Sequence, residues 1–146
     1  MRRAALALLA ALASPAAAQP ADPSGTWLTE NRDAVIAMGR CANGGLCGQI
    51  VGIPLDPGDA VPSDHQGRSQ CRLVIIYDVR PDADDWSARI VDPRDGGIYR
   101  ARLRVDEAGR LRVRGYLGIT LFGATQVWTP YAGRVPADCR MPSPIP

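Results

Sequence analysis

The sequence predicts an all-β domain built as a single antiparallel meander of about eight short strands. Runs of alternating or β-branched residues recur at short intervals, and clusters of Gly, Pro, Asp and Asn separate them. Beyond the first 18 residues, no stretch keeps a helical period for three turns. Short successive strands with tight connections close as a barrel or fold over as a sandwich. The expected strands lie near residues 26–30, 34–40, 46–53, 72–79, 86–91, 97–105, 110–116 and 124–129.

Residues 1–18 have the pattern of a secretory signal peptide. Two arginines come first, an apolar stretch follows from Ala4 to Ala13, and three alanines end at Ala18. The apolar stretch is too short to span a bilayer. We therefore expect cleavage near Ala18, a periplasmic or secreted location, and one domain over residues 19–146.

The exported chain is expected to be nearly neutral. The full sequence has 17 basic and 15 acidic residues, and two of the basic ones, Arg2 and Arg3, belong to the leader. Neutral charge and the absence of a second apolar segment from the sequence predict a protein that neither binds nucleic acid nor spans a membrane. The sequence gives no indication of an oligomeric state.

All four cysteines fall in the exported part, where an oxidising compartment favours disulfides. Of the three possible pairings we favour Cys41 with Cys47, because Asn-Gly-Gly between them can turn a hairpin. Cys71 would then pair with Cys139 and tie the proline-rich, extended tail of residues 130–146 to the body. A zinc site is the alternative, but no CxxC pair exists and His65 is the only histidine.

The sequence contains no catalytic motif. His65 stands beside Asp64 in the long polar segment from Pro54 to Gln70, which is either a binding loop or a solvated excursion. The acidic cluster 82–85 lacks the spacing of a calcium loop and is expected to mark a turn before Trp86. We therefore expect a binding protein that is no enzyme and uses no cofactor or metal, although a hydrolase with paired carboxylates would need no motif.

Residues 100–115, RARLRVDEAGRLRVRG, predict a hairpin with arginines on one face. A three-residue loop with Gly109 in the left-handed conformation sets Arg104 opposite Arg112 and Arg102 opposite Arg114. Facing like charges repel, so we expect compensation from carboxylates such as Asp92 and Asp95, from salt, or from an anionic partner. The face is then either a solvated outer surface or an anion-binding stripe for lipid phosphates or other acidic envelope polymers. The candidate anion-binding residues are Arg100, Arg102, Arg104, Arg112 and Arg114.

Aromatic side chains are the candidates for an interior binding site. Tyr99 has the same strand parity as Leu103, and Tyr77 has that of Ile75, so both are expected to point inward. Each of these aromatic residues can be core instead, because buried aromatics are mostly structural. The candidate ligand-binding residues are Trp27, Tyr77, Trp86, Tyr99 and Trp128.

Several fragments together resemble a bacterial exported family known only as domain of unknown function 2147. They are Gly25-Thr26-Trp27, the segment from Cys41 to Ile50, Asp92-Pro93-Arg94-Asp95-Gly96 with Tyr99, and the stretch from Leu111 to Gly118 continued by Phe122-Gly123 and Trp128. The resemblance implies a small β-barrel similar to lipocalins, usually proposed to hold a small apolar ligand, and no established activity. The segment after Asp64 departs from the family pattern, and Cys71 and Cys139 are additions to its usual cysteine pair.

Two functions follow from these observations. The first is an exported barrel that binds a small apolar or amphipathic molecule among Trp, Tyr and aliphatic side chains. The alternative is a cell-envelope interaction module that docks on an anionic envelope component or partner through its outer arginine face.

Overall fold

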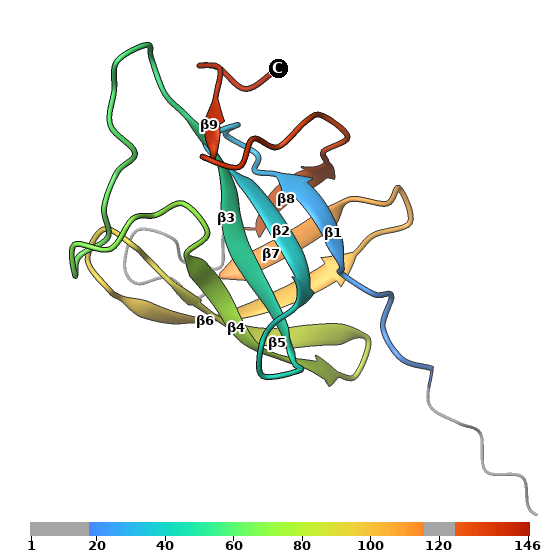
Figure 1. Ribbon diagram of the computed structural model, residues 1–146. Helices are drawn as coiled ribbons and strands as arrows, with labels where there is room; N and C mark the ends of the chain where they lie inside the picture. The colour runs from blue at the N-terminus through green and yellow to red at the C-terminus, as the bar shows by residue number, and fades with distance from the viewer. Residues whose placement is uncertain (1–17, 116–124) are drawn as a thin grey trace, which may run out of the picture.

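The computed structural model describes residues 18–115 and 125–146. Its strands are β1 (Gly25–Leu28), β2 (Val35–Arg40), β3 (Leu46–Pro54), β4 (Val74–Asp82), β5 (Asp85–Val91), β6 (Ile98–Val105), β7 (Leu111–Gly115), β8 (Thr125–Pro130) and β9 (Arg140–Met141). Each of the first eight pairs antiparallel with the next along the chain, and β8 pairs with β1, so the meander closes as a barrel (Figure 1). This arrangement confirms the predicted barrel and excludes the sandwich.

The predicted strands differ from the observed ones mainly around β4. Residues 70–73 form a turn in which Arg72 adopts a left-handed φ of 66° and the Leu73 amide donates to the Gln70 carbonyl. The strand therefore begins at Val74 instead of residue 72 and runs on to Asp82, where a two-residue turn leads into β5. The predicted strand ends at residues 116 and 124 lie outside the described residues. The two-residue β9 was not predicted, because it lies in the proline-rich tail.

The barrel has two different ends. One end, here called the closed end, carries the N-terminal segment 18–24 and the β2–β3, β4–β5 and β6–β7 turns. The other, here called the loop end, carries the long β3–β4 connection (residues 55–73) and the β5–β6 turn (residues 92–97), which lie side by side in Figure 1. A hydrogen bond from the His65 amide to the Pro93 carbonyl, 2.8 Å long, joins these two segments.

The C-terminal tail packs against the outside of the barrel and is held by more than its disulfide. Met141 and Ile145 form a second apolar cluster with residues of β1, β2 and β3 that face outward: Leu28, Val35 and Val51. The Arg32 guanidinium donates to the Ile145 carbonyl, with 2.8 Å from its Nε. The tail thus covers an apolar strip that the strands would otherwise expose to water.

Both predicted disulfides are present. Cys41 and Cys47 clip the β2–β3 hairpin with their Cα atoms 5.9 Å apart. Cys71 and Cys139 join the β3–β4 connection to the tail across a sequence separation of 68 residues. Cys139 is completely buried and belongs to the main core.

Candidate functional site

Tryptophan side chains fill the interior near the closed end. Trp27 and Trp128 are each 5% exposed, and Trp86 is 9% exposed. The indole N–H of Trp86 donates to the Ala21 carbonyl over 2.8 Å, and that of Trp27 donates to the Pro23 carbonyl over 2.9 Å. The N-terminal segment therefore supplies the partners that these two buried indole N–H groups need, and its Pro23 is itself buried at this end.

Two inward-facing side chains at the loop end are only partly buried. Ile90 and Tyr99 pair directly across β5 and β6, both point inward, and both are partly exposed. A Cβ atom at Gly97 would lie 2.5 Å from the Tyr99 hydroxyl, so only glycine allows the tyrosine ring to fold against the β5–β6 turn. Tyr99 thus points inward, as its parity predicted, and lies at the rim of the barrel.

The predicted inward position of Tyr77 is wrong. Tyr77 pairs directly with Arg89, an exposed residue of the outer face, and paired residues of antiparallel strands share a face. The pairing of β3 with β4 skips Ile75, and such a bulge reverses the alternation that follows it. Ile76, in consequence, occupies the core with no exposure and Tyr77 points outward.

The β3–β4 connection packs over part of the loop end. Leu55 and Val61 contact the main core, and His65 lies against Gly96 so closely that a Cβ there would be 2.6 Å from its Nε2. Burial of the Asp64 carboxylate acts to raise its pKa. Hydrogen bonds from the Arg68 side chain and from backbone amides outweigh this effect, so the pKa of Asp64 falls below its ordinary value of 3.8. The connection is therefore an ordered structure fixed to the barrel.

The arginine hairpin has the predicted register. Arg104 pairs with Arg112 and Arg102 pairs with Arg114, while Leu103 and Val113 face the core. Gly109 has a φ of 74° in the three-residue loop, as predicted. All five candidate anion-binding residues, Arg100, Arg102, Arg104, Arg112 and Arg114, alternate with inward residues on β6 and β7 and so lie on the outer face.

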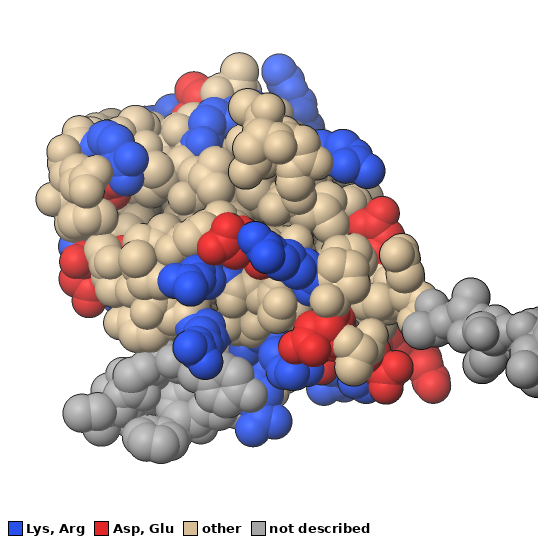
Figure 2. Space-filling model, turned by 90° about the horizontal axis from the view of Figure 1, so that it is seen from below, with Lys and Arg blue, Asp and Glu red and all other residues tan. Residues whose placement is uncertain are grey.

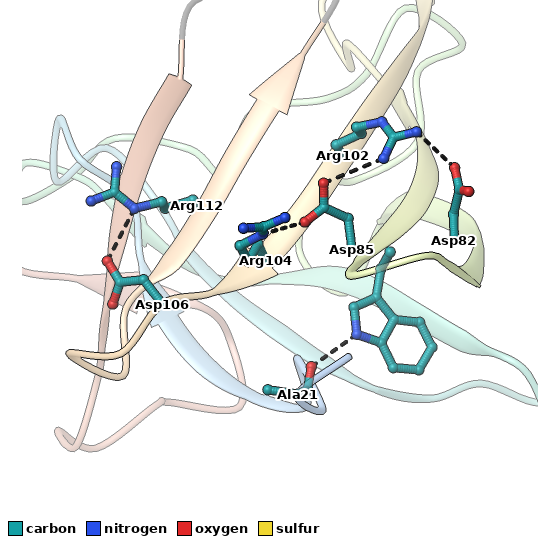
Figure 3. Close-up of polar contacts among 8 residues, drawn as sticks. Ala21, Asp82, Asp85, Arg102, Arg104, Asp106 and Arg112 are labelled. Atoms are coloured by element: carbon teal, nitrogen blue, oxygen red, sulfur yellow. Dashed lines mark hydrogen bonds and ion pairs between the residues drawn. The ribbon is translucent and has the colours of Figure 1, made fainter. Parts of the chain in front are cut away.

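The carboxylates that compensate this face differ from the predicted ones. Asp85 accepts from both Arg102 and Arg104, Asp82 accepts from Arg102 at 2.9 Å, and Asp106 accepts from Arg112 at 3.1 Å (Figure 3). The pKa of Asp106 is lowered mainly by a hydrogen bond from the backbone amide of Arg110, and the Arg110 side chain lowers it as well. Acidic and basic side chains consequently stand next to one another on the underside of the barrel (Figure 2).

Asp92 and Asp95, named as examples of compensating carboxylates, cap their own turn, and Asp92 pairs with Arg94 rather than with the hairpin. Asp92 accepts from the amide and guanidinium of Arg94, which lower its pKa, and Asp95 accepts from the Gly97 amide at 2.8 Å. Neither carboxylate contacts an arginine of the hairpin through an interaction seen in the described residues.

A groove of about 690 Å³ crosses the outer face of β4, β5 and β6. Two rows of paired residues define it: Tyr77, Arg89 and Arg100 in one, and Arg80, Ser87 and Arg102 in the other. Its lining residues are Asp78, Arg80, Asp82, Ser87, Ala88, Arg89, Arg100, Ala101 and Arg102. Arg80, Arg89 and Asp78 also belong to this face and were not predicted, although Arg89 has the same outward parity in β5 as Arg102 has in β6.

The described residues hold no group of three or more His, Cys, Asp or Glu side chains placed to bind a metal ion. No helix in the described ranges has the length and apolar character needed to cross a membrane.

Comparison with known proteins identifies the family. No curated protein sequence gives a significant match. A solved structure with a similar fold is protein HP1028 from Helicobacter pylori, described as belonging to the lipocalin family; the TM-score is 0.61 at 16% identity, and the similarity covers 76% of this chain and 84% of that chain. A family model described as an uncharacterised protein conserved in bacteria, DUF2147, matches residues 25–130, from the first strand of the barrel to the last. The chain is therefore a member of the DUF2147 family with a lipocalin-like barrel.

Proposed function

We propose that this protein is an exported binding protein that holds a small apolar or amphipathic molecule in the loop end of its barrel. The observation that carries the proposal is the difference between the two ends. The indoles of Trp27 and Trp86 already have hydrogen-bond partners in the N-terminal segment, whereas the inward-facing Ile90 and Tyr99 remain partly exposed. A small barrel binds ligands at the end of its apolar interior where inward-facing side chains are not fully packed.

This geometry changes which of the candidate residues we expect to contact the ligand. Tyr99 at the rim is the main candidate, with Ile90 beside it and Leu103 deeper in the barrel. Trp27, Trp86 and Trp128 act mainly as the packed base of the interior, because they are at most 9% exposed. Tyr77, which faces outward, takes no part.

Binding of a neutral apolar fluorophore tests this proposal. N-phenyl-1-naphthylamine carries no charge, so the outer arginines do not attract it, and saturable binding by the purified protein is expected. Tyr99→Ala should weaken binding about tenfold, because it removes most of a buried aromatic contact. Val74→Ala is the matched control, since Val74 is an exposed aliphatic residue of β4 that the proposal does not place at the ligand.

Two results of this experiment would contradict the proposal. Absence of saturable binding, or an equal loss in Val74→Ala, contradicts a site inside the barrel. If saturable binding is found, native mass spectrometry of protein prepared from the envelope without detergent, followed by mass analysis of an organic extract, would identify a co-purified ligand.

A further inference from the structure

We propose that the groove on the outer face of β4, β5 and β6 is a binding site for a phosphate group. The proposal is independent of a ligand inside the barrel, because the groove residues Arg80, Arg89 and Arg100 point outward from the wall whose inner side is the core.

The positive charge of the groove is only partly compensated by the protein. Among its lining residues are four arginines and two aspartates. Asp82 bonds to Arg102 at 2.9 Å, and Asp78 lies 3.5 Å from Arg89. Within residues 18–115 and 125–146, the guanidinium groups of Arg80 and Arg100 have no ion-pair partner, so the groove carries two uncompensated charges.

The strand order places these two charges on opposite sides of one strand. Arg80 lies on β4 beside Ser87 of β5, and Arg100 lies on β6 beside Arg89 of β5, in the adjacent row. Alternate strands lie about 10 Å apart, a gap that two arginine side chains can close around one anion. An anion between them would also relieve the repulsion of Arg89 and Arg100, which face each other directly.

Phosphate is the anion that this arrangement favours. The planar guanidinium donates two parallel hydrogen bonds to a tetrahedral oxyanion, and a phosphate ester carries enough oxygens and charge for several arginines. A groove of about 690 Å³ also accommodates a ligand larger than the phosphate itself.

The apolar neighbours of the groove indicate what carries the phosphate. Ile98 stands two residues before Arg100 on the same face, pairs with Val91 and is 57% exposed. A large exposed aliphatic side chain beside an anion site suits an apolar chain attached to the phosphate. The phosphate of a lipid-like molecule therefore fits better than a free phosphate ester.

Two short ligands with the same phosphate chemistry provide the test. Calorimetric titration would use dihexanoyl phosphatidic acid and glycerol 3-phosphate at low salt and at about 0.15 M salt. The double variant Arg80→Gln with Arg100→Gln should lose about tenfold or more in affinity for both ligands, because charge-assisted hydrogen bonds are lost. The matched control, Arg110→Gln with Arg112→Gln, removes the same charge from the same face outside the groove and should bind like the wild type.

Two single variants sharpen the result. Asp78→Asn removes a negative charge from the groove and should tighten binding of both ligands. Ile98→Ser should weaken only dihexanoyl phosphatidic acid if the apolar chain lies on Ile98; equal affinity would assign the site to the phosphate group alone. The proposal is overturned if neither ligand binds, or if the two double variants lose affinity equally, since that would indicate a nonspecific charge effect. Circular dichroism of each variant confirms that the barrel is intact.

Discussion

The disulfide between Cys71 and Cys139 should stabilise this barrel far more than the one between Cys41 and Cys47. A disulfide restricts the unfolded chain, and the restriction grows with the length of the closed loop. The sequence separations are 68 and 6 residues. In the chain-entropy model these loops correspond to about 4 and about 2 kcal/mol of the unfolding free energy.

The location of Cys139 adds to the difference. Its side chain is completely buried in the main core, whereas Cys41 is partly exposed at a hairpin turn. Replacement of Cys71 and Cys139 by alanine therefore also removes buried volume and loosens the attachment of β9 to β3. The tail remains held by Ile145 and Arg32, so we expect a weakened barrel that still folds.

Urea unfolding followed by tryptophan fluorescence measures both effects. The double variant Cys71→Ala with Cys139→Ala should lose about 4 kcal/mol or more, and Cys41→Ala with Cys47→Ala should lose about 2 kcal/mol. Limited proteolysis should cut residues 131–138 faster in the first variant only. If the first variant loses no more stability than the second, the tail is fixed by its apolar contacts and the reasoning from loop length fails.

Two further predictions concern the ends of the barrel. Trp86→Phe leaves the Ala21 carbonyl without its indole donor, so the unfolding free energy should fall by about 1 kcal/mol and proteases should remove the N-terminal segment faster; Ser87→Ala is the control, and equal stability of Trp86→Phe would contradict the role of the segment as a closure. Asp64 has a folded pKa below 3.8, so its stabilising effect is complete above about pH 4 and is lost as the pH falls through the folded value. Asp64→Asn should thus be less stable than wild type near neutral pH and converge with it in acid; parallel curves of unfolding free energy against pH would refute this.

The register of the arginine hairpin could be predicted because its information is local. Asp106 and Gly109 fix a three-residue loop, and once the loop is fixed the alternation of arginines and aliphatic residues admits one register. The tail was less predictable. Its apolar partners, among them Leu28 and Val35, face away from the barrel, and nothing in their own strands indicates that Ile145 will cover them.

The correct partners of the arginines could have been derived by counting from a turn. The Asp92 amide donates to the Gly97 carbonyl, which closes the β5–β6 turn and pairs Val91 with Ile98. Counting back along both strands then brings Arg89 opposite Arg100 and the start of β5, Asp85, next to Arg104. Nearness in sequence favoured Asp92 and Asp95 instead, but in an antiparallel hairpin the residues farthest along the chain from the turn are also paired.

The residues that β4 contributes to the groove could not be derived by counting residue pairs from a turn, because β4 is irregular. The pairing of β3 with β4 shifts register between Gly48 and Gln49 of β3, and the pairing of β4 with β5 shifts between Tyr77 and Arg80 of β4. Asp78, which lies between Tyr77 and Arg80, has a φ of 52°. A bulge exists only when two strands are paired, so the alternation within β4 alone predicts the wrong face for Tyr77. The second shift restores the parity, so Arg80 faces outward in the row of Ser87 and Arg102. A regular β4 with the predicted parity would bury Tyr77, so the bulges of β4 decide that Tyr77 joins Arg89 and Arg100 in a row on the outer face.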